Sequence, residues 1–200
     1  RSGQAQAVII NSGCANACTG EAGLQNARGM ARAAADALGI DERLVLVCST
    51  GVIGVHLPME RIAAGAGLAV QALSREGGDD AAHAIMTTDT VDKQVAVELE
   101  IDGKTVCIGG MCKGSGMIEP NMATMLGFLT TDAAIHAQAL DQALREAVDV
   151  SFNHLVVDGD RSTNDTVILM ASGAAQNQVL TPYHPQWQYF VDALTVVCLE

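Results

Sequence analysis

Three groups of hydroxyl side chains in apolar, glycine-rich surroundings are the clearest candidates for chemistry in this sequence. They are Ser49-Thr50-Gly51, Thr87-Thr88-Asp89-Thr90 and Ala123-Thr124. The histidines offer less, because none has a neighbouring nucleophile or a partner at metal-ligand spacing. These histidines are His56, His83, His136, His154 and His184. A hydroxyl attacks a carbonyl only when a base accepts its proton. The sequence therefore predicts threonine chemistry that does not rely on histidine.

Thr124 follows a glycine-rich stretch and opens an apolar run. Residues 113–121 predict a loop and residues 124–129 a buried strand. Ala123 is small and leaves its carbonyl open to attack. A break of the Ala123-Thr124 bond would free the threonine α-amine, whose unperturbed pKa of about 7.7–8.0 suits it to accept the hydroxyl proton. A threonine that begins a buried strand can also be there because β-branched residues pack well in strands.

The other candidates have equally plain structural interpretations. Ser49-Thr50-Gly51 has the composition of a turn that ends a strand. The Thr87-Thr88-Asp89 run could cap a helix through its side-chain oxygens. Lys113 stands in the predicted loop, where a lysine is ordinarily solvated. The residues alone leave these alternatives open.

Asp158 to Asp165 alternates oxygen-bearing side chains in the manner of a calcium loop. The closing bidentate glutamate of such a loop is missing, because Leu169 stands in its place. We therefore expect a hydrogen-bonded turn and no metal site. The stretch from Gly109 to Gly116 lacks the Gly-Lys-Thr ending of a phosphate-binding loop.

Helices and strands mix around these candidates without a strict strand–helix alternation. We expect strands at residues 7–10, 44–48, 94–101, 105–109, 124–129, 155–157 and 166–170. The alternation of Val95, Val97, Leu99 and Ile101 and the two-residue turn Asp102-Gly103 predict that 94–101 and 105–109 form a hairpin. We expect helices at residues 21–38, 58–73 and 185–199, and one that Asp132 caps. Gly39 should end the first of them, and Gly77-Gly78 should break the chain after the second. This order predicts an α+β fold of packed layers rather than a doubly wound sheet.

Composition narrows the class of protein. The 200 residues suffice for one large or two small domains. A net charge of -12 argues against nucleic-acid and anionic membrane partners, which require basic patches. Six cysteines without a C-x-x-C pair predict buried free thiols in a reducing compartment. We find no basic-then-apolar leader and no apolar run near the ~20 residues that cross a bilayer, so we expect a cytoplasmic protein.

Five strings, in order along the chain, resemble the self-cleaving ornithine acetyltransferases (glutamate N-acetyltransferases) of arginine biosynthesis. They are Asn11-Ser12-Gly13 with Ala15-Asn16-Ala17, Ser49 to Gly54, Ile85 to Thr90, Lys113 to Leu126, and Asp158 to Thr166. The resemblance extends over nearly the whole chain. It implies a layered α/β sandwich of the N-terminal-nucleophile kind.

The resemblance also implies a reaction. The acetyl group of N2-acetyl-L-ornithine would pass to L-glutamate through an acetyl ester on Thr124, after self-cleavage at Ala123-Thr124. The Thr50 hydroxyl and the Gly51 backbone N–H would form the oxyanion hole, where loss of one donor costs roughly 3–4 kcal/mol. No metal or cofactor is implied, although acetyl-CoA could serve as a second acetyl donor.

Further implications concern the substrate pocket and the assembly. Lys113 would pair with the substrate carboxylate, and Thr87 would line the same pocket. Residues 1–123 would form the end of an α chain and residues 124–200 the beginning of a β chain, in a heterotetramer of two α and two β chains. The family is longer at both ends, so we expect its N- and C-terminal parts to be absent here. An N-terminal-threonine amidase or peptidase, and an inactive binding module, are the alternatives.

Overall fold

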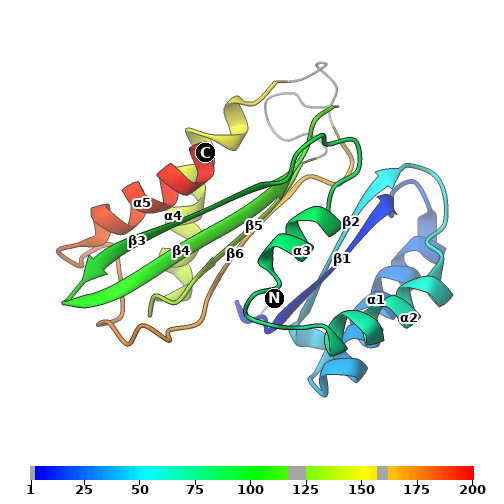
Figure 1. The fold of residues 1–200 in the computed structure, drawn as a ribbon, viewed down its shortest axis with the longest axis horizontal. Coiled ribbons are helices and arrows are strands. Elements are labelled where there is room, and N and C mark those ends of the chain that lie inside the picture. Colours follow the sequence, from blue (N-terminus) through cyan, green and yellow to red (C-terminus); the bar gives the residue numbers. More distant parts are fainter. Residues whose placement is uncertain (1–2, 117–124, 157–161) are drawn as a thin grey trace. The chain divides into compact units, whose positions relative to one another are not determined.

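The computed structural model describes residues 3–116, 125–156 and 162–200. The chain forms two compact units, Arg1–Asp89 and Thr90–Glu200. Both contain helices and strands, which confirms the predicted α+β class (Figure 1).

The first unit is built on two parallel strands joined by a helix. Its elements are β1 (Ala7–Cys14), α1 (Gly20–Leu38), a 3-10 turn (Glu42–Leu44), β2 (Val45–Val52), α2 (Met59–Gln71) and α3 (Gly78–Ala84). The parallel pairing runs without a break from Ala7 opposite Val45 to Cys14 opposite Val52. Buried Ala34 and Ala35 of α1 pack against Val45 of β2. Small side chains thus allow the crossover helix to lie close to the strands.

The second unit is a four-stranded sheet with helices packed on one face. Its elements are β3 (Lys93–Ile101), β4 (Lys104–Lys113), β5 (Leu126–Thr131), α4 (Ala137–Asp149), a 3-10 turn (Phe152–His154), β6 (Thr166–Ala171) and α5 (Trp187–Leu199). The strand order is β3-β4-β5-β6. The first two pairings are antiparallel and β5 is parallel to β6. The predicted hairpin of residues 94–109 is therefore confirmed as β3 and β4.

The core of the second unit lies between the sheet and its two long helices. Every fourth residue of α4 is a buried alanine, at Ala139, Ala143 and Ala147. This spacing places the alanines on one helix face, where they allow close packing. From α5, Phe190 is fully buried and its ring stacks with Trp187 at a centroid distance of 6.4 Å.

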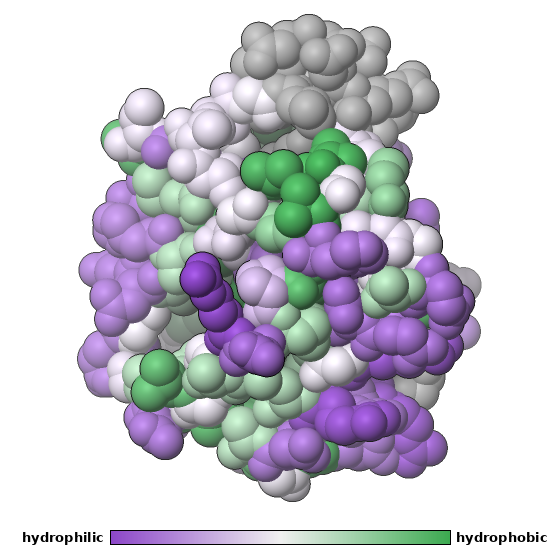
Figure 2. All heavy atoms as spheres, turned by 90° about the vertical axis from the view of Figure 1, so that its right-hand side faces the viewer, coloured by the Kyte–Doolittle hydropathy of each residue, from purple (hydrophilic) through white to green (hydrophobic). Residues whose placement is uncertain are grey.

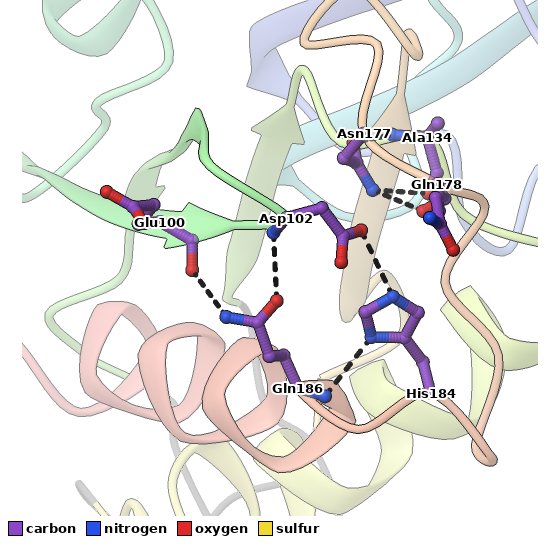
Figure 3. A network of polar contacts seen from close by, with 7 residues as sticks. All are labelled: Glu100, Asp102, Ala134, Asn177, Gln178, His184 and Gln186. Carbon is purple, nitrogen blue, oxygen red and sulfur yellow. Dashed lines mark hydrogen bonds and ion pairs between the residues drawn. The ribbon is translucent and has the colours of Figure 1, made fainter.

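The turn of the β3–β4 hairpin is tied to the beginning of α5 (Figure 3). His184 Nε2 lies 3.1 Å from a carboxylate oxygen of Asp102. The Asp102 N–H donates to the Gln186 side-chain oxygen at 2.8 Å, and the Gln186 amide donates to the Glu100 carbonyl at 3.1 Å. Both turn residues, Asp102 and Gly103, have positive φ, as a type I′ turn requires. These bonds fix α5 in register with the hairpin.

Several sequence predictions were wrong in detail. Ser49-Thr50-Gly51 belongs to β2 and is not a turn. Helix α3 was not predicted, since Gly77-Gly78 indicated a break. Asp132 does not cap α4, whose N-cap is His136. The Asp132 carboxylate instead accepts the Cys107 N–H at 2.7 Å, a long-range bond that no local pattern signals.

Two other predictions fail for similar reasons. Residues 155 and 156 are not in a strand, because the chain leaves the 3-10 turn in irregular structure. The cysteines are free, yet Cys18 and Cys107 are exposed rather than buried. Within the three described ranges no helix is long and apolar enough to cross a membrane.

Exposed apolar side chains stand at the last residue of β2 and directly after the strand. Val52, Ile53 and Val55 are each more than a third exposed. Figure 2 shows one face of the molecule, on which a small apolar patch stands among polar side chains.

Candidate functional site

Two of the sequence motifs lie side by side at the carboxyl ends of the parallel strands β1 and β2. They are Asn11-Ser12-Gly13 and Ser49-Thr50-Gly51. Ser12 lies opposite Thr50, and Gly13 lies opposite Gly51. Thr50 is fully buried, although its side chain is polar. Carboxyl ends of parallel strands are where α/β proteins commonly place ligand-binding groups.

Gly51 is required at its position by geometry. Its φ of +127° lies in the region that side chains with a Cβ rarely adopt. A Cβ built there would stand 2.2 Å from the Gly13 carbonyl carbon and 2.6 Å from the Cys14 nitrogen. The absence of a side chain thus lets the two strand ends approach closely and leaves the Gly51 backbone uncovered by a side chain of its own.

The segment that carries Thr87 is held to the same strand ends. The Ser12 hydroxyl donates to the Ala84 carbonyl at 2.7 Å, at the end of α3. Thr87 is exposed three residues later, and its N–H approaches the Asp89 carboxylate at 3.4 Å. Thr87 therefore follows α3 and caps no helix. The first unit brings Thr50, Gly51 and the segment leading to Thr87 into one region.

Lys113 lies in the second unit, at the end of β4. It is not solvated as a loop lysine would be, because only 3% of its surface is exposed. Strand alternation puts it on the sheet face opposite Ile108 and Cys112, which pack in the core beneath the helices. Its register partner is Leu126, the first residue of β5. The buried ammonium group is therefore next to the strand that follows Ala123-Thr124 in the sequence.

Asp165 joins this region, and sequence reasoning gave it no individual role. Its carboxylate Oδ1 accepts the Met125 N–H at 2.8 Å. The Thr166 N–H donates in turn to the Met125 carbonyl at 3.1 Å. Burial raises the pKa of the Asp165 carboxyl, while the Met125 amide, the Lys113 charge and the Ser162 hydroxyl act against that rise. A signal for Asp165 did exist, since it belongs to one of the five family-like strings.

Some predicted residues lie outside the described part of the chain. These are Ala123 and Thr124, and Asp158, Gly159 and Asp160 of the calcium-like segment. The described end of that segment is a hydrogen-bonded turn, in which the Asn164 N–H donates to Ser162 Oγ at 3.1 Å. Among the described side chains, no three His, Cys, Asp or Glu groups are placed to hold a metal ion.

A cavity of about 270 Å³ lies in the second unit between the strands and the end of α5. Lys113 and Met125 touch it, but Leu129, Val197 and Cys198, which also line it, belong to the apolar core. Much of its lining is thus shared with the core, and we do not assign a substrate to it.

The match to the ArgJ family model extends over residues 1–200. The chain belongs to the ArgJ family. It is 61% identical over 198 residues to the "Arginine biosynthesis bifunctional protein ArgJ" of Symbiobacterium thermophilum. It is 58% identical over 193 residues to the protein of the same name in Bacillus subtilis. These matches cover 99% and 96% of this chain, but 49% and 47% of the relatives. The chain thus spans about half the length of these ArgJ proteins.

Two solved structures are similar to the chain. One is the arginine biosynthesis bifunctional protein of Bacillus halodurans, with 48% identity, a TM-score of 0.53, and coverage of 58% of this chain and 61% of that one. The other is the ornithine acetyltransferase of Mycobacterium tuberculosis in complex with ornithine, with 50% identity, a TM-score of 0.53, and coverage of 57% and 61%. The expected α+β fold of this family is therefore confirmed.

Proposed function

We propose that the full-length protein transfers the acetyl group of N2-acetyl-L-ornithine to L-glutamate in the cytoplasm, as a step of arginine biosynthesis. The observation that carries this proposal is the 50% identity to an ornithine acetyltransferase that binds ornithine. The close approach of Gly51 to Gly13 and the burial of Thr50 and Lys113 support it, because they are the features an oxyanion hole and a carboxylate-binding cation require.

Maturation comes first in the proposed sequence of steps. The Thr124 hydroxyl attacks the Ala123 carbonyl, the C–N bond breaks, and an ester joins Ala123 to the threonine oxygen. Water hydrolyses that ester. The products are a carboxylate on Ala123 and a free α-amine on Thr124, which then serves as the base for its own hydroxyl.

Acetyl transfer follows in two halves. Thr124 Oγ attacks the acetyl carbonyl of acetylornithine as its proton passes to the α-amine, and ornithine leaves with that proton on its own amine. The α-amine of glutamate then attacks the acetyl ester, which yields N-acetylglutamate and restores the hydroxyl. Thr50 Oγ and the Gly51 N–H stabilise the oxyanion in each half, Lys113 pairs with the substrate carboxylate, and Thr87 lines the pocket.

The test separates the two roles of Thr124 in the full-length protein. Thr124→Ala should abolish cleavage and transfer, whereas Thr124→Ser should keep part of each because it retains the oxygen. Edman sequencing of the second piece of the wild type should begin Thr-Met-Leu-Gly-Phe. The decisive control co-expresses a piece ending at Ala123 with a piece beginning at residue 124 and carrying Thr124→Ala. Near wild-type transfer by that pair would contradict the ester mechanism.

Donor, acceptor and assembly need separate measurements. Release of acetate in place of acetylglutamate would identify an amidase, and an uncut, inactive chain would identify a binding module. Acetyl-CoA compared with acetylornithine as donor decides whether the protein performs one reaction or two. We propose a heterotetramer of two α and two β chains, which light scattering of the cleaved protein would test.

A further inference from the structure

The partly buried carboxylate of Asp165 accepts a hydrogen bond from the backbone N–H of Met125, the residue directly after the proposed nucleophile. Met125 directly follows Thr124 in the sequence, and its nitrogen is covalently bonded to the Thr124 carbonyl carbon. A group that fixes the Met125 N–H therefore restrains the nucleophile's backbone from one bond away.

Both backbone polar groups of Met125 are held from the same short segment. Asp165 Oδ1 accepts its N–H at 2.8 Å, and the Thr166 N–H donates to its carbonyl at 3.1 Å. Met125 itself is 4% exposed and packs in the core. The pairing of β5 with β6 begins at the next residue, with Leu126 opposite Thr166. The residue after Thr124 is thus anchored before the strand begins.

A strand ladder alone does not need this carboxylate. A buried carboxylate is costly unless its oxygens are paired, yet Asp165 Oδ2 is buried and has no hydrogen-bond partner among the described residues. An unpaired buried oxygen lowers stability, and Asp165 lies in one of the strings that resemble the family. We therefore expect Asp165 to have a role in the proposed active site as well as in folding.

We propose, on the basis of the proposed function, that Asp165 is a positioning residue that acts through the Met125 amide to hold Thr124 in line for cleavage and for acetyl transfer. Misplacement of a reacting group by about 1 Å can cost about 100-fold in rate. The effect should therefore appear in the chemical steps and not in substrate affinity.

The chain provides a matched control at the opposite end of β5. Asp132 directly follows β5, and its carboxylate accepts the Cys107 N–H at 2.7 Å. Asp132 and Asp165 thus make the same kind of bond at the two ends of one strand. Loss of either bond should lower stability, but only the bond of Asp165 adjoins the nucleophile.

The experiment uses the full-length protein and measures the cleavage rate constant, kcat, KM and the thermal midpoint. Asp165→Ala should lower cleavage and kcat by about 100-fold and change KM by less than about threefold. Asp165→Asn should stay within about tenfold of wild type, because the amide oxygen can still accept the Met125 N–H. Asp132→Ala should lower the thermal midpoint while both rates stay within about twofold of wild type.

The proposal is overturned if Asp165→Ala reacts at wild-type rates, or if Asp132→Ala slows the chemistry equally. Should Asp165→Ala not fold, Asp165→Glu keeps the charge but displaces the oxygens, so it must be slower than Asp165→Asn. The opposite order would show that charge rather than the acceptor position matters, and would also overturn the proposal. Failure of the proposed acetyltransferase function would give a different result, because the wild type would cleave but transfer no acetyl group to glutamate. The cleavage rates of the variants would still test the role of Asp165.

Discussion

A Cβ atom on Gly51 would stand 2.2 Å from the carbonyl carbon of Gly13, so the ends of β1 and β2 meet at a distance that only glycine permits. The two residues are also register partners in the parallel pair. This contact aligns Thr50 with Ser12 and gives the proposed oxyanion hole its rigid support.

Gly51→Ala should therefore destabilise the protein by at least about 2 kcal/mol, since it combines an unfavourable φ with a backbone collision. The measurement is the midpoint of chemical denaturation. Gly65→Ala in α2 is the matched control, because nothing lies within 4 Å of a Cβ there. That change should stabilise the protein by about 0.5–1 kcal/mol, as alanine does inside helices. Equal effects of the two changes would contradict the close approach of the strands.

Thr50→Ala should lower kcat by about 10²–10³-fold with a much smaller change in KM, because its hydroxyl acts on charge that develops only in the transition state. Steady-state kinetics with acetylornithine and glutamate measure both constants. Thr50→Ser keeps the hydroxyl and should recover most of the loss. A rise in KM without loss of turnover would make Thr50 a substrate-binding residue instead.

Lys113→Met should raise the KM for acetylornithine by about 10- to 100-fold, since a charge-assisted hydrogen bond to a carboxylate contributes about 1.5–3 kcal/mol. Lys104→Met is the control, because Lys104 lies exposed at the other end of β4. The pKa of Asp165 should also rise in Lys113→Met, since the lysine charge helps to lower it. Carbon-13 NMR titration of the carboxyl would show the direction. An unchanged KM would remove Lys113 from the binding site.

Cys198 should resist alkylation in the native protein. Burial raises the pKa of its thiol to about 11, and its side chain is 7% exposed. At pH 8 only about one thiol in a thousand is then ionised, and the thiolate is the reactive form. Iodoacetamide followed by peptide mass spectrometry should show exposed Cys18 modified and Cys198 intact, with both modified after unfolding. Comparable native labelling of the two would contradict the buried position at the end of α5.

The local sequence pattern was sufficient to predict those helices and strands whose signals lie within a few neighbouring residues. The alternation of Val95, Val97 and Leu99 with the turn at Asp102-Gly103 predicted the β3–β4 hairpin, because side-chain period and turn geometry are both properties of neighbours in the chain. Gly39 ended α1 as expected, with φ of 68°. The strings that resemble the family indicated a set of site residues, but they did not indicate which contacts position each one. The set is Thr50, Gly51, Thr87, Lys113 and Thr124.

Tertiary structure decided which of these residues have neighbours that support chemistry. The sequence by itself assigned Ser49-Thr50-Gly51 to a turn and Asp132 to a helix cap, since their composition suits both. Strand register places Gly51 against Gly13, and a bond across 40 positions joins Met125 to Asp165. Such contacts depend on how distant segments pair and on what becomes buried between them. A linear pattern records residue types and spacings. The burial of Lys113 and the partial burial of Asp165 arise only when the strands assemble.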